Sequence, residues 1–435
     1  MEIFPKSPSV PATFMFQRRS FPFLIALLIL GTLHAQDSAP SAADVNSALG
    51  VKLFDDDNLW DDDASATAQR LDWPLESETS TDSSFRKYPG TDERILDCRP
   101  YSTVLLAEQG SPSSLSLVFA NKGDAVVYST SESDRATIRT KNKQVRDLPK
   151  LIREDKNKIQ SALTELFGEP VVDRYGQGRE TRENVKRWDW NGHAFLLASP
   201  RDEYVAIRIM PTESADAGGK SRILDSEIRA RVSARVENRP NGDVILKDMP
   251  MVNQGPKGYC VPATWERVMR YMGIPADMYV LAMAGETKEG GGTNLTDIAE
   301  GARESVIRSG RKIERVKIKP NPINVSKYID RGLPLIWAMF STNEFNEAAN
   351  SRKKMRLETS IDSKEWKKTL SEARKSGRRF KKFTDTAHVC MIIGYNKETD
   401  EIAVSDSWGP EFSERWVTPE EAQAVSQNDF QIITF

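Results

Sequence analysis

Apolar residues recur at alternating and at helical spacing along most of the chain, which predicts a mixture of strands and helices. In the first half the predicted strands are 102–106, 115–120, 186–190, 194–198 and 204–209. Two of these strands flank Asn191-Gly192, a pair that fits the type I′ turn of a hairpin. The longer apolar repeat over 148–167 predicts a helix that Gly168 closes. Together these elements predict a small α+β accessory domain over residues 50–211.

The second half repeats this mixture after an interruption. The segment 211–220 is polar and a charged helix is predicted over 221–236, so we interpret 212–243 as a linker with a charged helix. From residue 244 onward the pattern predicts a buried helix that starts near Cys260, and strands at 333–340, 388–395 and 401–408. The predicted fold class is therefore α+β: helices packed on an antiparallel sheet over 244–435, behind the smaller α+β domain.

The first residues are interpreted as a targeting signal rather than as part of the fold. Arg18 and Arg19 precede the apolar run 21–33, and Ala35 offers a small residue at a cut, which is typical of a secretory signal peptide over 1–35. The arginine pair also fits a twin-arginine signal, and Met15 is an alternative start. We expect a flexible lead-in over 36–49, no membrane span in the mature chain, and a secreted or periplasmic protein.

Composition removes several classes of function. The net charge is −2, so no bulk field selects nucleic acid. The chain has three cysteines and three histidines, and they are not clustered, so we expect neither a metal site nor a cofactor. The aspartates 61–63 lack the glycine and the distant glutamate of a calcium loop and are interpreted as the start of a helix.

Cys260 has the local setting of a reactive thiol. It lies at the start of the predicted helix, whose N-terminus favours negative charge and therefore stabilises a thiolate. Gln254 lies in the preceding loop, from which its amide can point at a developing oxyanion.

A base for this thiol has to come from far along the chain, because catalytic partners meet in space. His388 is the histidine that lies C-terminal to Cys260, and it begins a predicted core strand. The next predicted strand, 401–408, carries Asp406 near its end. An antiparallel hairpin of these two strands would bring Asp406 beside His388, where it can orient the imidazole.

The order of Gln254, Cys260, His388 and Asp406 resembles the papain-like cysteine peptidases. The segments Cys-x-Pro-Ala at Cys260 and Asp-Ser-Trp-Gly at Asp406 resemble peptidase family thirty-nine, whose founding members remove double-glycine leaders from bacteriocins. The resemblance covers less than half of the chain and implies a bacterial thiol peptidase. It implies that Cys260 is the nucleophile, His388 the general base and acid, Asp406 the orienting residue and Gln254 the oxyanion donor. Papain itself has asparagine at the position of Asp406.

Other residues of reactive type have plainer interpretations. We expect His193 to be an exposed turn residue, Cys98 a half-buried structural thiol and Cys390 a small buried residue beside the site. The segment 351–382 is rich in Lys and Arg, with an apolar stripe over 363–375. A solvated face is its default interpretation, and a mobile lid at the cleft that selects acidic or cell-wall-linked peptides is the alternative.

The predicted function is hydrolysis of a peptide or isopeptide bond through an acyl-enzyme, with a peptide or protein, including cell-wall peptide, as the substrate. Two alternatives stay open. The same constellation serves a cell-wall peptide amidase or transpeptidase, and an inactive secreted binding protein could retain these residues. The sequence leaves the oligomeric state and the role of the first domain undetermined.

Overall fold

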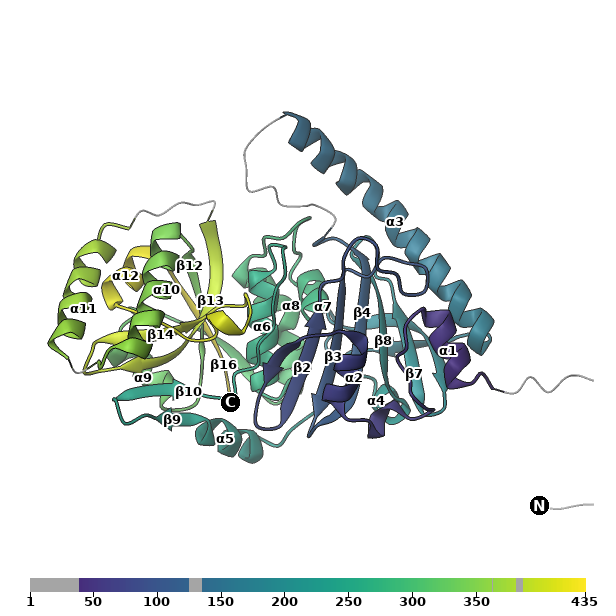
Figure 1. Ribbon diagram of the computed structural model, residues 1–435, viewed down its shortest axis with the longest axis horizontal. Coiled ribbons are helices and arrows are strands. Elements are labelled where there is room, and N and C mark those ends of the chain that lie inside the picture. The colour runs from purple at the N-terminus through teal and green to yellow at the C-terminus, as the bar shows by residue number, and fades with distance from the viewer. Residues whose placement is uncertain (1–38, 125–134, 362, 381–385) are drawn as a thin grey trace, which may run out of the picture. The chain divides into compact units, whose positions relative to one another are not determined.

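The computed structural model describes residues 39–124, 135–361, 363–380 and 386–435, with the side chains of 135–146 left out. The predicted signal peptide therefore lies outside the described residues, and secretion stays a prediction. Residues 39–435 form one compact unit. It contains two eight-stranded sheets (Figure 1), and every pairing between their strands is antiparallel. The α+β class is confirmed, whereas the domain boundaries stay a prediction.

The first sheet has the strand order β1-β2-β3-β4-β8-β7-β6-β5. Its strands are β1 Leu75–Glu78, β2 Asp82–Lys87, β3 Ser102–Glu108, β4 Ser111–Asn121, β5 Val171–Tyr175, β6 Glu183–Trp190, β7 His193–Ala198 and β8 Tyr204–Pro211. The predicted turn is present, since Asn191 and Gly192 both have positive φ between β6 and β7. The strands predicted in this half are therefore confirmed, within a residue or a few at their ends.

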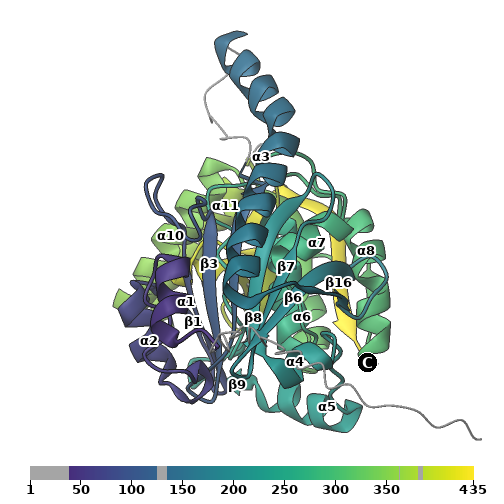
Figure 2. The same ribbon diagram turned by 90° about the vertical axis from the view of Figure 1, so that its right-hand side faces the viewer.

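Both faces of the first sheet are buried, as the alternation along β7 shows. Phe195 and Leu197 pack on one face with α1 Ala42–Leu49, α2 Ala64–Leu71 and α3 Arg135–Phe167. Helix α3 crosses this face (Figure 2). Ala194 and Leu196 point to the other face and pack against residues from the second half of the chain. The sheet is thus shared by two cores.

The second sheet has the order β11-β16-β12-β13-β10-β9, and β14 pairs with β13 and β15 beside this path. Its strands are β9 Val236–Asn238, β10 Asp243–Leu246, β11 Lys312–Val316, β12 Leu335–Phe340, β13 Ala387–Asn396, β14 Glu401–Ser405, β15 Arg415–Val417 and β16 Ser426–Thr434. The helices around it are α5 Asp225–Ala234, α6 Cys260–Tyr271, α7 Met278–Ala284, α8 Leu295–Arg308, α9 Pro322–Ile329, α10 Asn343–Glu358, α11 Lys364–Gly377 and α12 Pro419–Val425.

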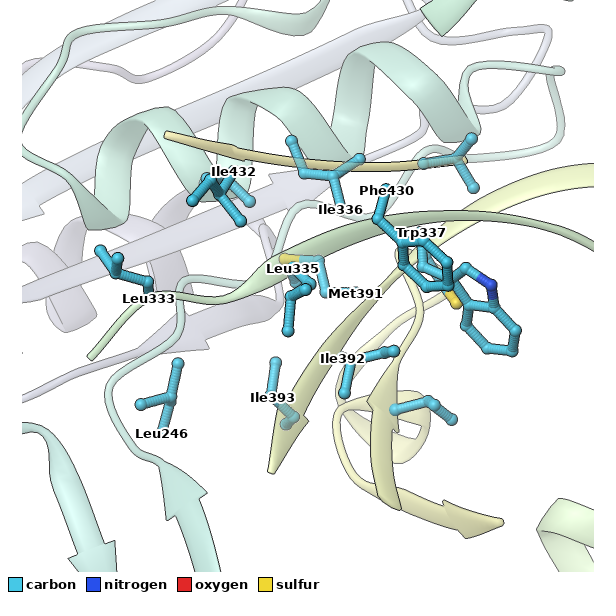
Figure 3. Packing of buried hydrophobic residues seen from close by; sticks show 14 of the residues in the cluster. Leu246, Leu333, Leu335, Ile336, Trp337, Met391, Ile392, Ile393, Phe430 and Ile432 are labelled. Atoms are coloured by element: carbon cyan, nitrogen blue, oxygen red, sulfur yellow. The ribbon is translucent and has the colours of Figure 1, made fainter. Parts of the chain in front are cut away.

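Side chains of the neighbouring strands β12, β13 and β16 form the centre of the second core (Figure 3). Trp337 and Phe430 stack there with their ring centres 6.4 Å apart. Helix α6 packs Trp265, Val268 and Met269 into this core. The apolar stripe predicted for the helix is therefore confirmed. Among the described residues, no helix is both long and apolar enough to cross a membrane.

Two segments predicted to be irregular contain helices. Residues 42–49 of the expected flexible lead-in form α1, because Ser41 and Asp44 close a capping box at its start and Val45 and Leu49 are buried. The expected linker 211–220 contains α4 Thr212–Asp216, which buries Ala215 against the first sheet. Burial of a few apolar residues in otherwise polar segments decided both outcomes.

The prediction of an exposed His193 is wrong. The side chain is fully buried among the rings of Phe54, Trp60 and Trp190. Its Nε2 accepts a hydrogen bond from the Leu59 backbone N–H, and its Nδ1 lies 3.2 Å from the Trp190 carbonyl. Burial lowers the pKa of His193, which favours the neutral ring that this pattern requires. Cys98, expected to be half-buried, is also buried.

In its described residues, 351–361 and 363–380, the basic segment packs against its own domain, and its role as a lid stays a prediction. Trp366 and Leu370 of α11 form a small buried cluster with Ile361, and α11 packs beside α12 (Figure 1). The Trp366 Nε1 donates to Glu401 on β14. The apolar stripe therefore covers the domain's own surface, and residues 381 and 382 lie outside the described part.

This placement makes a prediction about stability. We expect Trp366→Ala to lower the free energy of unfolding by about 3 kcal/mol, because a fully buried indole is removed. Leu357→Ala is the control, since Leu357 is 83% exposed, and should change stability by less than about 0.5 kcal/mol. Urea unfolding measures both. If both substitutions changed the free energy of unfolding equally and by little, α11 would instead be only loosely attached to the domain.

Candidate active site

Helix α6 places Cys260 at its first residue. The helix is buried along most of its length, and Pro262 stands in the first turn, where its missing N–H leaves no helix bond unmade. The approach to the helix is a loop in which Gly255 takes a positive φ of 69°. Cys260 itself is only partly buried, at the start of a rigid helix.

The hairpin of β13 and β14 brings His388 and Asp406 together, as the sequence predicts. Its register pairs Met391 with Ser405, so Asp406 follows directly beyond the paired residues. The His388 Nε2 lies 2.8 Å from the Asp406 Oδ1. Both side chains are buried, so this hydrogen bond is shielded from water.

The thiol of Cys260 hydrogen-bonds the side chain of His388. Since Nε2 faces Asp406, Nδ1 is the ring nitrogen left for the sulfur. Burial by itself raises the pKa of the Cys260 thiol, but the hydrogen bond and the charge of His388 outweigh it and hold the pKa below its ordinary value. Burial lowers the pKa of His388, yet its bonds to Asp406 and Cys260 raise that pKa to about 9. Both shifts favour the pair of a thiolate and an imidazolium over the neutral pair.

Arg415 is a site residue that the sequence analysis missed. Its Nη2 donates to the Asp406 Oδ2, and its Nη1 donates to Asn346 and Asn350 on α10. Burial raises the pKa of Asp406, but the Arg415 charge and the His388 bond keep that pKa below its usual value. Asp406 thus stays ionised beside the ring. A lone arginine in a short strand gives no sequence signal for this pairing.

Trp408 also lies at the site without having been predicted to. Its ring stacks on the His388 imidazole with centroids 4.7 Å apart and planes inclined by 30°. The Arg415 guanidinium lies 5.5 Å from the same Trp408 ring. The stacked indole limits rotation of the imidazole, and its π-face stabilises the nearby positive charge. The Asp-Ser-Trp-Gly segment was the available signal.

Helix and hairpin are locked to each other by buried polar contacts. The Thr264 Oγ1 donates to the Val389 carbonyl, and the Arg267 Nη2 donates to the Ser405 Oγ. Burial lowers the pKa of Arg267 to about 10, so the guanidinium stays charged near neutral pH. These bonds fix the distance between the helix that carries Cys260 and the strands that carry its partners.

Gln254 lies in the loop before Cys260, as predicted, and is buried. Its backbone N–H donates to the Ser407 carbonyl, and its side-chain Nε2 donates to the Lys257 carbonyl. One N–H of the amide is thus used to orient the group, and the second has no acceptor in the part of the chain that the structure describes. The Gln254 Oε1 is buried and has no hydrogen-bond partner among the residues that the structure describes.

The other two cysteines differ from Cys260. Cys390 is buried two residues after His388 on β13, and burial raises its pKa well above the usual value. Burial raises the pKa of Cys98 to about 12. Both thiols are free and neutral, in keeping with structural roles. In the described ranges, no group of three or more His, Cys, Asp or Glu side chains is arranged to hold a metal ion.

Comparison with known proteins gives one result for the second half of the chain. Residues 246–433 match the model of the Peptidase_C39 like family, a family of cysteine peptidase type. A search of curated proteins found no match. The matched range contains α6 and the β13–β14 hairpin. The C-terminal part of this chain is therefore similar to the Peptidase_C39 like family, and its α+β fold is consistent with a papain-like cysteine peptidase domain.

Proposed function

We propose that the chain is an active cysteine hydrolase that cleaves a peptide or isopeptide bond through an acyl-enzyme. The observation that carries the proposal is the continuous contact from Cys260 through His388 to Asp406. This arrangement supplies a nucleophile, a proton carrier and an orienting carboxylate within hydrogen-bond reach of one another. An inactive member of the family would not need the ionised pair.

Each residue has one task in the proposed reaction. The Cys260 thiolate attacks the carbonyl carbon, and the Cys260 backbone N–H and the Gln254 amide hold the oxyanion that forms. The His388 imidazolium protonates the leaving amine and is left neutral. It then takes a proton from water, whose oxygen attacks the thioester and releases the acid. Asp406 stays ionised and holds the ring throughout.

The substrate is proposed by class only. A cell-wall peptide amidase or transpeptidase would use the same groups, and it would differ in passing the acyl group to an added amine rather than to water. We also propose that the protein acts outside the cytoplasm, because the segment 1–35 has the composition of a signal peptide. Edman or mass analysis of the exported protein would give an N-terminus near residue 36 if this is correct.

The direct test of the proposal is labelling. Iodoacetamide at pH 6 should alkylate Cys260 well before Cys98 or Cys390, because only the first has a lowered pKa while burial raises the other two. Peptide mapping by mass spectrometry measures the three rates. The Cys260→Ser protein is the control for turnover of a fluorogenic peptide mixture. Equal labelling of the three thiols in the folded protein would contradict the proposal.

The pKa directions also predict the pH profile. The thiolate is present above the lowered pKa of Cys260, and the imidazolium persists until pH rises through about 9. The value of kcat/KM should therefore form a plateau through neutral pH and fall on the alkaline side near 9. A profile that rises through pH 9, as a neutral ring acting as base on a neutral thiol would give, would exclude the ion pair.

Substitutions at the hairpin separate the roles of its two residues. We expect His388→Ala to lower kcat by about three orders of magnitude or more, and Asp406→Asn to cause a loss about tenfold to a hundredfold smaller. Asp406→Asn should also lower the melting temperature, since Arg415 is left buried without its charged partner. Asn350→Ala, which removes only one acceptor of Arg415, is the matched control. Full activity in His388→Ala would exclude His388.

A further inference from the structure

The loop that leads to Cys260 is held by the first sheet as well as by its own domain. The Met251 N–H donates to the Ser77 Oγ at 2.9 Å, and the Asn253 N–H donates to the Glu76 Oε1 at 2.7 Å. The Tyr88 hydroxyl donates to the Asn253 carbonyl. The partners in the first sheet come from β1 and the end of β2. Neither half of the chain therefore defines this loop alone.

Lys257 makes the most deeply buried contact between this loop and the first sheet. Its side chain is 1% exposed, and its Nζ lies 3.2 Å from the Asp124 Oδ2, a carboxylate that is itself 9% exposed. The ammonium also lies 4.6 Å from the ring centre of Tyr88, 5.8 Å from Tyr259 and 5.4 Å from Tyr279. A buried ammonium is costly without a partner, so the carboxylate and the three rings fix where this side chain lies.

The backbone of Lys257 orients the proposed oxyanion donor. Its carbonyl accepts the Nε2 of Gln254 at 2.9 Å and the backbone N–H of Tyr259 at 2.9 Å. The next residue, Gly258, donates its N–H to the Gly290 carbonyl. The Gly290 N–H in turn donates to the carbonyl of Lys122, the residue that follows β4 of the first sheet. A movement of the Lys257 side chain would therefore move the carbonyl that holds the Gln254 amide.

We propose that Lys257 and Asp124 are positioning residues, an ion pair between the two halves of the chain that holds the Gln254 amide in the oxyanion-binding geometry. The first sheet is then a part of the active site and not a detachable accessory domain. This inference rests on the proposed function, because it assigns Gln254 to the oxyanion.

The ion pair is not needed merely to hold the halves together. An apolar cluster already joins them, with Val118, Tyr204 and Ala206 of the first sheet packed against Tyr259 and Ala263. A second buried polar contact lies on α8, where the Gln177 amide donates to the Ser305 carbonyl and the Ser309 hydroxyl. Gln177 therefore provides a control: a buried contact between the halves that does not touch the loop.

The test compares Lys257→Met/Asp124→Asn, which removes both charges with little change in volume, with Gln177→Met. With p-nitrophenyl acetate as the acyl donor, we expect the double variant to lower kcat about 10- to 100-fold, because a misplaced donor costs about this much. KM should stay within about threefold. Alkylation of Cys260 by iodoacetamide should stay within about twofold, because His388 still forms the thiolate. Gln177→Met should leave all three values unchanged.

The other outcomes each decide a point. An unchanged kcat in the folded double variant overturns the inference, and so does a parallel loss of kcat and of alkylation, which would indicate a structural role only. If the double variant does not fold, Asp124→Asn alone is used. Because the Asn amide oxygen still accepts from Lys257, the expected fall in kcat is smaller, about threefold to tenfold. An unchanged kcat in this variant overturns the inference. Absence of both ester hydrolysis and Cys260 alkylation in the unmodified protein would overturn the proposed function as well.

Discussion

The burial of helix α6 between two apolar cores is the constraint on which the rest of the site depends. Trp265, Val268 and Met269 pack into the core of the second sheet, while Tyr259 and Ala263, at the start of the helix, pack against the first sheet. A helix held on two sides in this way cannot rotate or slide without opening a cavity in one core. Its first residue, Cys260, therefore has a fixed place, and the thiol can meet a histidine that arrives from a distant strand.

Buried charge pairs, together with packing, fix the positions of the site residues. From Arg415 to Asp406, His388 and Cys260 the formal charges alternate in sign, and all four side chains are partly or fully buried. Removal of any one member leaves an unpaired charge in a medium of low dielectric constant. The same physics applies to Lys257 and Asp124 at the other end of the loop. The site is therefore bordered on both sides by buried ion pairs that fix geometry.

Much of the site could be read from the sequence because its residues lie in strongly patterned elements. The apolar stripe after Cys260 and the continuous apolar strand after His388 predict a helix and a core strand, and the hairpin between that strand and the next brings Asp406 to His388. The predictions failed where polar stretches carry a few apolar residues. His193 lies after a turn and was expected to be exposed, yet Phe54, Trp60 and Trp190 converge on it from separate elements.

The sequence by itself predicted the secondary structure around the proposed site from local periodicity, and it singled out Cys260, Gln254, His388 and Asp406 by residue chemistry and by their resemblance to a known family. Only the tertiary structure decided which surfaces these elements cover and which charges they pair. The apolar run 194–198 of β7 allows burial on both faces, but no local pattern indicates what packs on the second face. Likewise Arg415, Trp408 and Asp124 acquire their partners through contacts between residues far apart in the chain, which a pattern along one sequence does not encode.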